Sequence, residues 1–226
     1  MCTLREKEEF NEEESKTMEF KAHKVLGYTQ MTARDISEHK YQPASRTLSA
    51  FLNINKMCHL YLGIQDDGTV KGHHMFAAQM EHFKQNLDLL MKKRFDPPVD
   101  RYRYVVNFIE VEAFDGAAVY PSTPGLTLKQ EHKLLLQPNV CWCEQEITQL
   151  YHKGGKNPPL YVIHVQINKW DPNRDSNAFK VWPYFTTEEG KCFTRYNASN
   201  HEVPPDQVIE QTKLDLQELL SEVSVH

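Results

Sequence analysis

The chain has 226 residues, of which 40% are hydrophobic and 25% are charged. A chain of this length and composition forms one globular domain or two small ones, and it can bury a core without disulfides or metals. The net charge of −5 excludes a histone-like polycation, and no stretch approaches the roughly 20 apolar residues of a membrane span. The start of the chain lacks the apolar region of a signal peptide, and five cysteines cannot all pair. We therefore expect reduced thiols and a cytoplasmic protein, with a nuclear location also open.

The acidic residues concentrate at the start of the chain. Residues 1–14 carry six glutamates against Arg5 and Lys7, a net charge of −4, whereas the rest is close to neutral. Such a charge run is typical of a solvated segment. We therefore predict a flexible acidic tail over residues 1–13 and a single domain over residues 14–226.

The first predicted strand begins near Thr17. Met18 and Phe20 alternate there with Glu19 and Lys21, which is the period of a strand. This pattern predicts that the apolar pair faces the core and that the charged pair faces solvent.

Three elements follow in the first half of the chain. Residues 43–53 predict a short helix with Pro43 in its first turn, and residues 60–71 predict a hairpin that turns at Asp67-Gly68. Residues 75–94 give the clearest helix, because their Phe, Met and Leu residues recur at i, i+3 and i+4 before Pro97-Pro98.

The second half predicts more strands and one helix. Strands are expected over residues 102–111, 161–167, 179–185 and 192–196, a turn-rich insertion over 113–139, and a helix over about 204–222 that Pro204-Pro205 open. Mixed strands, helices and hairpins favour an α+β fold with a mixed sheet and packed helices over a doubly wound sheet.

Three carboxylates stand out as candidates for chemistry. If the strands over 18–21 and 60–64 are neighbours, Glu14, Glu19 and Asp66 could converge at one place. A carboxylate cluster is costly unless a cation neutralises it, and Mg²⁺ or Mn²⁺ prefers such oxygens. The metal could activate water, and Lys21 could stabilise developing negative charge. The plain alternative is a solvated Glu14 in an acidic run and an ordinary turn at Asp66-Asp67-Gly68.

Four patches of the sequence resemble the Schlafen family and its AlbA-like core. They are Glu14-Ser15-Lys16-Thr17-Met18-Glu19-Phe20-Lys21, Ser49-Ala50-Phe51-Leu52-Asn53, the run from Leu62 to Gly72, and Arg195-Tyr196-Asn197-Ala198-Ser199-Asn200. Their order along the chain matches that of the family, and together they span about residues 14–205. The pattern departs from the family where Met57-Cys58-His59 replaces a Gly-Gly pair and where Asn197-Ala198 replaces Gly-Ser.

The resemblance implies a function in RNA processing. Nuclease-active Schlafens hold metal with three carboxylates and cleave tRNA, which assigns Glu14, Glu19 and Asp66 as metal ligands and catalytic residues with Lys21, and Asp67 as a less suitable substitute for Asp66. The chain has one AlbA-like lobe, whereas vertebrate Schlafen cores pack two into an RNA cradle. This arrangement resembles the nematode schlafen-like subunits that trim piRNA precursors, so other schlafen-like chains are expected partners, in hetero- or homo-oligomers.

Two further functions stay open. The chain could be a non-catalytic subunit that binds RNA or scaffolds a schlafen-like partner, and then it would not bind Mn²⁺ through Glu19. It could instead be an AlbA-like regulator that binds duplex DNA and RNA comparably.

Basic and zinc-binding residues complete the candidates. RNA phosphates need cations, and the candidates are Lys24, Arg101, Arg103, Lys153, Lys156 and Arg195. The family often carries a structural Zn²⁺, for which Cys141 and Cys143 are the best pair, with Cys58, His59 or Cys192 as partners. A Cys-x-Cys pair is a poor substitute for a Cys-x₂-Cys knuckle, so buried free thiols are the alternative.

Overall fold

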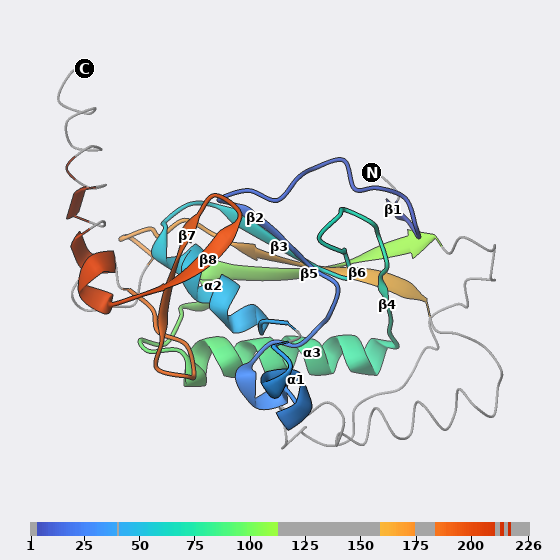
Figure 1. Ribbon diagram of the computed structural model, residues 1–226, viewed down its shortest axis with the longest axis horizontal. Helices are drawn as coiled ribbons and strands as arrows, with labels where there is room; N and C mark the ends of the chain where they lie inside the picture. Colours follow the sequence, from blue (N-terminus) through green and yellow to red (C-terminus); the bar gives the residue numbers. More distant parts are fainter. Residues whose placement is uncertain are drawn as a thin grey trace.

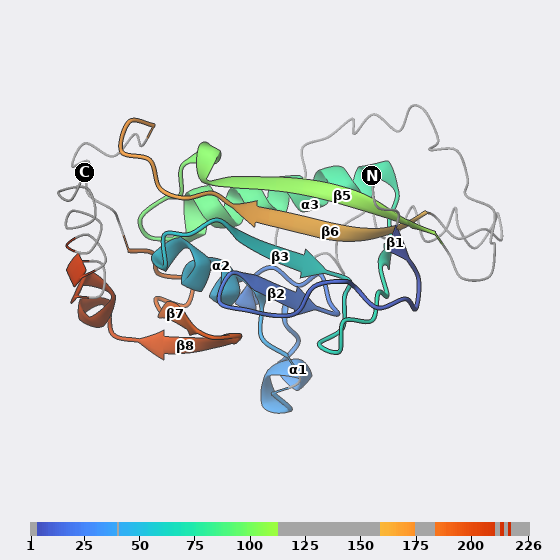
Figure 2. The ribbon, with the colours of Figure 1, turned by 90° about the horizontal axis from the view of Figure 1, so that it is seen from above.

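A six-stranded mixed sheet forms the centre of the protein. The computed structural model describes residues 4–39, 41–112, 159–174, 184–210, 213, 214 and 217. The strand order is β1-β5-β6-β3-β2, with β4 paired to β6 (Figure 2). The strands are β1 (Leu4–Arg5), β2 (Met18–Lys21), β3 (Cys58–Leu62), β4 (His73–His74), β5 (Tyr104–Glu112) and β6 (Leu160–Ile167). β2 is parallel to β3 and β1 to β5, whereas β6 is antiparallel to its neighbours. The sheet and its helices confirm the α+β prediction.

α2 and α3 pack on one face of the sheet (Figure 1), whereas α1 buries no residue. The three helices are α1 (Ala33–Ser37), α2 (Ala44–Asn53) and α3 (Ala77–Leu89), and α3 continues as a π-helix over Leu90–Arg94. Leu48 and Phe51 of α2 and Leu87 of α3 join the apolar side chains of β3, β5 and β6 in the main core. No helix in the described ranges is long and apolar enough to span a membrane.

α3 begins two residues later than the apolar spacing predicts. The backbone N–H of Met75 donates to the carbonyl of Pro159, and the N–H of Phe76 donates to Oε1 of Gln79 at 2.9 Å. The first N–H groups of a helix have no acceptor within the helix. Here Pro159 and Gln79 supply acceptors for the N–H groups of residues 75 and 76, so the helix begins after them.

The acidic N-terminal segment lies on the other face of the sheet. Leu4 and Arg5 pair with the end of β5, and the N–H of Phe10 donates to the carbonyl of Gly68. The ring of Phe10 packs edge-on against Phe20, with centroids 5.5 Å apart, and it also contacts Tyr61. The predicted flexible tail is therefore corrected over residues 4–10, because one apolar ring and the sheet edge hold this charged segment.

The C-terminal part of the chain packs on α2. A hairpin of β7 (Cys192–Tyr196) and β8 (Ser199–Val203) lies against this helix. Ser49 and Asn53, one turn apart, donate side-chain hydrogen bonds to the carbonyl of Phe185, and Asn53 also donates to the carbonyl of Phe193. The Ser-Ala-Phe-Leu-Asn patch is therefore a docking surface for this hairpin.

Several predicted elements can be compared only in part. The helix expected over 204–222 is present over residues 205–210. The strand expected over 102–111 starts later, at Tyr104, because a 3-10 turn over Arg101–Arg103 precedes it. The strand expected over 179–185 is described only at residues 184 and 185, which are not in a strand. The insertion expected over 113–139 lies outside the described residues.

Candidate functional site

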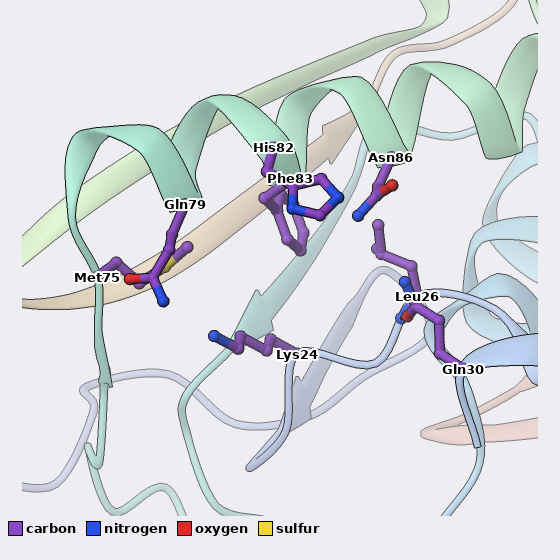
Figure 3. Close-up of a pocket in the computed structure, with 8 residues that line it drawn as sticks. All are labelled: Lys24, Leu26, Gln30, Met75, Gln79, His82, Phe83 and Asn86. Carbon is purple, nitrogen blue, oxygen red and sulfur yellow. The ribbon is translucent and has the colours of Figure 1, made fainter. Parts of the chain in front are cut away.

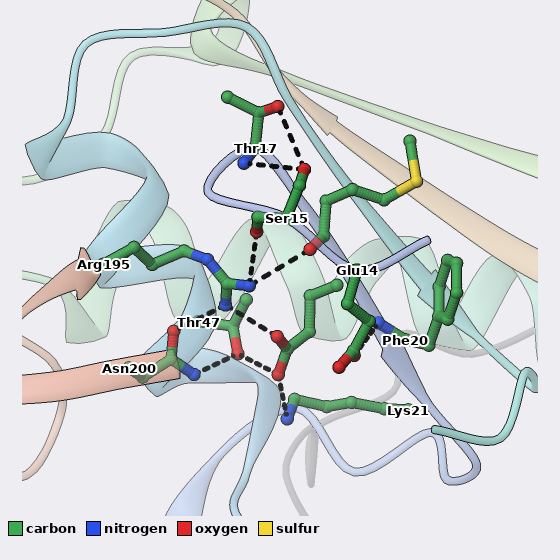
Figure 4. A network of polar contacts seen from close by, with 10 residues as sticks. Glu14, Ser15, Thr17, Phe20, Lys21, Thr47, Arg195 and Asn200 are labelled. Carbon is green, nitrogen blue, oxygen red and sulfur yellow. Dashed lines mark hydrogen bonds and ion pairs between the residues drawn. The ribbon is translucent and has the colours of Figure 1, made fainter. Parts of the chain in front are cut away.

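The site is built around Glu19 in the edge strand β2. Its Oε2 accepts a hydrogen bond from Nη1 of Arg195 at 2.6 Å, and its Oε1 accepts one from Nζ of Lys21 at 3.0 Å (Figure 4). The hydroxyl of Thr47, on α2, donates to the same Oε1 at 3.5 Å. Glu19 and Lys21 are only 7% and 9% exposed, which corrects the predicted solvent-facing charged pair. They are buried because α2 and the β7–β8 hairpin cover this side of the strand.

Arg195 joins three distant parts of the chain. Besides Glu19, its guanidinium donates to Oδ1 of Asn200 at 2.9 Å and to the carbonyls of Ser15 and Met18 at 2.7 and 3.1 Å. Its side chain is fully buried, and it stacks on the ring of Phe51. The prediction that Arg195 contacts RNA is therefore corrected, because its donors face the protein interior.

Glu14 lies beside this network. Its Oε1 accepts a hydrogen bond from the backbone N–H of Phe20 at 2.8 Å. Partial burial raises its pKa, and the carboxylates of Glu19 and Asp66 raise it further, whereas the Phe20 N–H and Arg195 act in the opposite direction. The three carboxylates that the sequence singled out therefore act electrostatically on one another at Glu14.

Asp66 and Asp67 have different roles in the hairpin turn. Oδ1 of Asp67 accepts a hydrogen bond from the N–H of Thr69 at 2.9 Å, which lowers the Asp67 pKa, and Gly68 has a positive φ of 83°. Asp67 is thus committed to the turn. Asp66 is exposed and adds to the field at Glu14, so its position favours Asp66 over Asp67 as a member of the site.

Two of the three carboxylates, Glu14 and Asp66, could take part in holding a divalent cation. Glu14 carries an unfavourable negative charge that a cation would relieve, and the exposed Asp66 can supply further oxygens. Both oxygens of Glu19 are bonded to cationic side chains. Within the described ranges, no three His, Cys, Asp or Glu side chains are grouped to hold an ion. Glu14 and Asp66 are therefore the residues that would hold a metal, with Glu19 fixed behind them.

The other basic candidates differ in exposure. Lys24 is half-buried after β2, and the exposed Arg101 lies over the ring of Tyr104 and 3.7 Å from Asp88. Arg103 is only 2% exposed, and its Nε donates to the carbonyl of Asn168 at 3.0 Å, so the prediction that it binds RNA is corrected. The candidates Lys153 and Lys156 lie outside the described residues.

The cysteines of the described ranges are buried thiols. Burial raises the pKa of Cys58 to about 12 and that of Cys192 to about 11, and both are free. The predicted pair Cys141 and Cys143 lies outside the described residues.

The sequence analysis did not identify a threonine and two histidines that lie at or near the site. Thr47 bonds Glu19 and also accepts a hydrogen bond from Nδ2 of Asn200 at 2.8 Å. Its position two residues before Ser49, on a helix that carries a motif, was the available signal. His23 and His73 lie next to the basic residues that follow β2, and burial lowers their pKa values to about 4 and about 3, aided by Lys21 and Lys24 respectively.

Comparison with known families agrees with this arrangement. The family model described as "Schlafen, AlbA_2" matches residues 14–204, which include Glu14 and every described residue of the Arg195 network. The match begins after the N-terminal segment that pairs with the sheet. The motif order, the mixed sheet and this match lead to one conclusion: the chain belongs to the Schlafen AlbA_2 family.

Proposed function

We propose that this protein is a divalent-metal-dependent endoribonuclease, acting within a complex, that processes tRNA, piRNA precursors or similar RNA. Membership of the Schlafen AlbA_2 family is consistent with a nuclease or RNA-related function. The observation that carries the proposal is that Glu14, Glu19 and Asp66 lie close enough to interact: burial raises the pKa of Glu14 most, and the carboxylates of Glu19 and Asp66 raise it further. Such shifts cluster at functional sites.

Each charged residue has a separate task in this proposal. Glu14 and Asp66 would hold Mg²⁺ or Mn²⁺, which supplies activation of water and stabilisation of charge on a phosphodiester. Arg195 fixes the buried carboxylate of Glu19 and the backbone of Ser15 and Met18, so Glu14 starts from a rigid loop. Lys21 holds the other oxygen of Glu19, and its remaining N–H groups can donate to a phosphate oxygen.

The proposal includes a partner chain. We propose that another schlafen-like chain packs beside the domain of residues 14–204 and completes an RNA cradle with it. The exposed turn at Asp66 leaves the carboxylate cluster accessible to RNA held between two such chains.

Cleavage of labelled RNA tests the proposal. Purified protein, alone and with candidate partner chains, is mixed with tRNA and a short capped RNA in the presence of Mn²⁺ or EDTA. We expect metal-dependent products that Glu14→Gln and Asp66→Asn abolish without unfolding the protein. Asp67→Asn is the matched control, because it changes the neighbouring carboxylate of the same turn. Full activity in Asp66→Asn would refute the assignment.

A non-catalytic RNA-binding subunit is the second candidate. The specific observation in its favour is that both oxygens of Glu19 are bonded to cationic side chains. Titration calorimetry separates the two functions. Mn²⁺ binding that Glu14→Gln or Asp66→Asn removes supports the nuclease. RNA binding without such Mn²⁺ binding indicates the non-catalytic RNA-binding subunit.

A further inference from the structure

The cavity between α3 and the segment that follows β2 has a volume of about 30 Å³ (Figure 3). Such a volume holds about two water molecules and is too small for a nucleobase. Contacts to an RNA chain are therefore expected from exposed side chains, and one end of the sheet carries a group of exposed cations.

These cations belong to the end of the sheet where β6 ends and β2, β3 and β5 begin (Figure 2). Each of them is exposed, and each comes just before or just after one of these strands or in the loop after β6. They are Lys16, Lys56, Lys169 and Arg174, which we call the basic row.

Strand pairing and loop contacts bring the basic row together. Cys58 of β3 pairs with Ile167 of antiparallel β6, so residues 56 and 169 each lie two positions beyond this pair. The N–H of Trp170 donates to Oδ1 of Asn55 at 2.8 Å, which joins the two loops that carry these lysines. On the other side of β3, the carbonyl of residue 17 accepts the N–H of residue 59 at 2.8 Å, so residue 16 lies beside the start of β3. The guanidinium of Arg174 lies 4.8 Å from the ring centroid of Tyr102, next to β5.

The positive charge of the basic row is not compensated within the described part of the chain. No ion pair joins the row to a described carboxylate, whereas the exposed cations Arg5, Arg34 and Lys84 each pair with a glutamate. Asp171 lies in the same loop as two of the cations, and its Oδ1 accepts the N–H of Asn173 at 2.9 Å. In a chain with a net charge of −5, such a local excess of positive charge favours an anionic partner.

The basic row begins beside the carboxylate site. Lys16 follows Glu14 by two residues, so their Cα atoms are at most about 7 Å apart. Neighbouring strands are about 4.8 Å apart, so the row continues from Lys16 across two strand spacings, about 10 Å, to Lys169. Trp170, directly after Lys169, adds a half-buried aromatic ring. Cations combined with aromatic rings are typical of surfaces that bind single-stranded nucleic acid.

We propose that the basic row binds the phosphate backbone of single-stranded RNA and guides the strand to Glu14 and Asp66. The inference rests on the proposed function in taking RNA as the ligand. Lysine ammonium groups on flexible stems bind phosphates as point charges, and phosphate contacts carry no sequence information. The row therefore supplies affinity that is independent of the base sequence and that falls as the salt concentration rises.

Binding of RNA in EDTA tests this inference separately from cleavage. The full chain is titrated into a fluorescein-labelled single-stranded RNA at several salt concentrations, and binding is followed by fluorescence anisotropy. The triple variant Lys16→Gln, Lys56→Gln, Lys169→Gln should reduce the slope of log affinity against log salt by about 2 and weaken binding at low salt by about tenfold or more, because each lost phosphate contact on a single strand removes about 0.7 from the slope. The matched control is the triple variant Arg5→Gln, Arg34→Gln, Lys84→Gln, which removes the same charge from exposed residues elsewhere.

Each result supports or overturns the inference. An unchanged salt slope in the lysine variant overturns it, as does a control variant that is weakened equally, because net charge alone would then explain the loss. No RNA binding by the wild type at low salt also overturns it. An oligoglutamate peptide is titrated in parallel: if the lysine variant loses peptide binding but keeps RNA binding, the row binds an acidic protein and the inference is wrong.

Two further variants keep the test decisive. If the triple lysine variant fails to fold, Lys56→Gln with Lys169→Gln replaces it, with an expected reduction of the slope by about 1.4, and an unchanged slope is then the contrary result. Cleavage lost in Asp66→Asn with RNA binding retained separates this inference from the proposed function.

Discussion

Replacement of Arg195 by methionine tests whether the buried ion pair with Glu19 holds the site together. The Arg195 side chain is 0% exposed and that of Glu19 is 10% exposed, so neither charge is well solvated. Removing one member of a buried pair costs about 3–5 kcal/mol, because the remaining charge stays buried. Lys21 still compensates Glu19 at 3.0 Å, which places the expected loss near the lower limit, about 3 kcal/mol.

The free energy of unfolding is measured by urea denaturation for the wild type, Arg195→Met, Glu19→Gln and the double variant. The double-mutant cycle should give a coupling energy of at least about 1.5 kcal/mol, because each residue is the other's partner. Arg195→Lys keeps the charge but loses the planar fork that reaches Glu19, Asn200 and two carbonyls, so its stability should lie between wild type and Arg195→Met.

Two results would refute this reasoning. One is a loss below about 0.5 kcal/mol in Arg195→Met, which is the range of ordinary surface substitutions. The other is a coupling energy near zero, which would mean that the two residues stabilise the fold independently.

Three further predictions concern stability. Glu14→Gln should raise the free energy of unfolding at pH 7, because the raised pKa of Glu14 means that the fold disfavours its ionised form. This gain should disappear below about pH 4.3, the usual glutamate pKa, where Glu14 is protonated in the folded and unfolded states. Urea denaturation at several pH values measures it, and a gain that persists below that pH would contradict the assignment. Burial lowers the pKa of His73 to about 3, so its contribution to stability is fully present above about pH 6.5 and is lost as the pH falls from 6.5 toward 3. His73→Gln should therefore reduce the slope of the unfolding free energy against pH in this range by about 1.4 kcal/mol per pH unit. An unchanged slope in acid denaturation would argue against this assignment. Asn53→Ala removes side-chain bonds to the backbone of Phe185 and Phe193, and should cost about 2–4 kcal/mol in urea denaturation with earlier proteolysis of the β7–β8 hairpin, whereas a cost below about 0.5 kcal/mol would mean that the hairpin docks without them.

Local patterns were enough to predict most elements of the fold. Pro43 precedes α2, and the Asp67-Gly68 turn joins Ile64 to Val70 as the sequence indicated. These features depend on interactions within a few residues, which is why the sequence shows them. The N-terminal segment was misjudged because Phe10 is a single apolar residue among glutamates, and only the position of Phe20 and Tyr61 shows that its ring has a place to pack.

The charged residues of the site were harder to interpret. The alternation around Glu19 predicted its face of the strand correctly, but the pattern could not show that α2 and the β7–β8 hairpin cover that face. The sequence predicts an RNA contact for Arg195 for the same reason. Its partner Glu19 lies 176 residues away in the sequence, and such a pairing has no local pattern.

The sequence by itself determined the α+β class, the order of the motifs and the three carboxylates Glu14, Glu19 and Asp66. Only the tertiary structure decided that Arg195 and Lys21 neutralise Glu19 and that partial burial raises the pKa of Glu14. The physical reason is that charge compensation and desolvation depend on which distant segments pack together, whereas helix, strand and turn patterns depend on neighbouring residues.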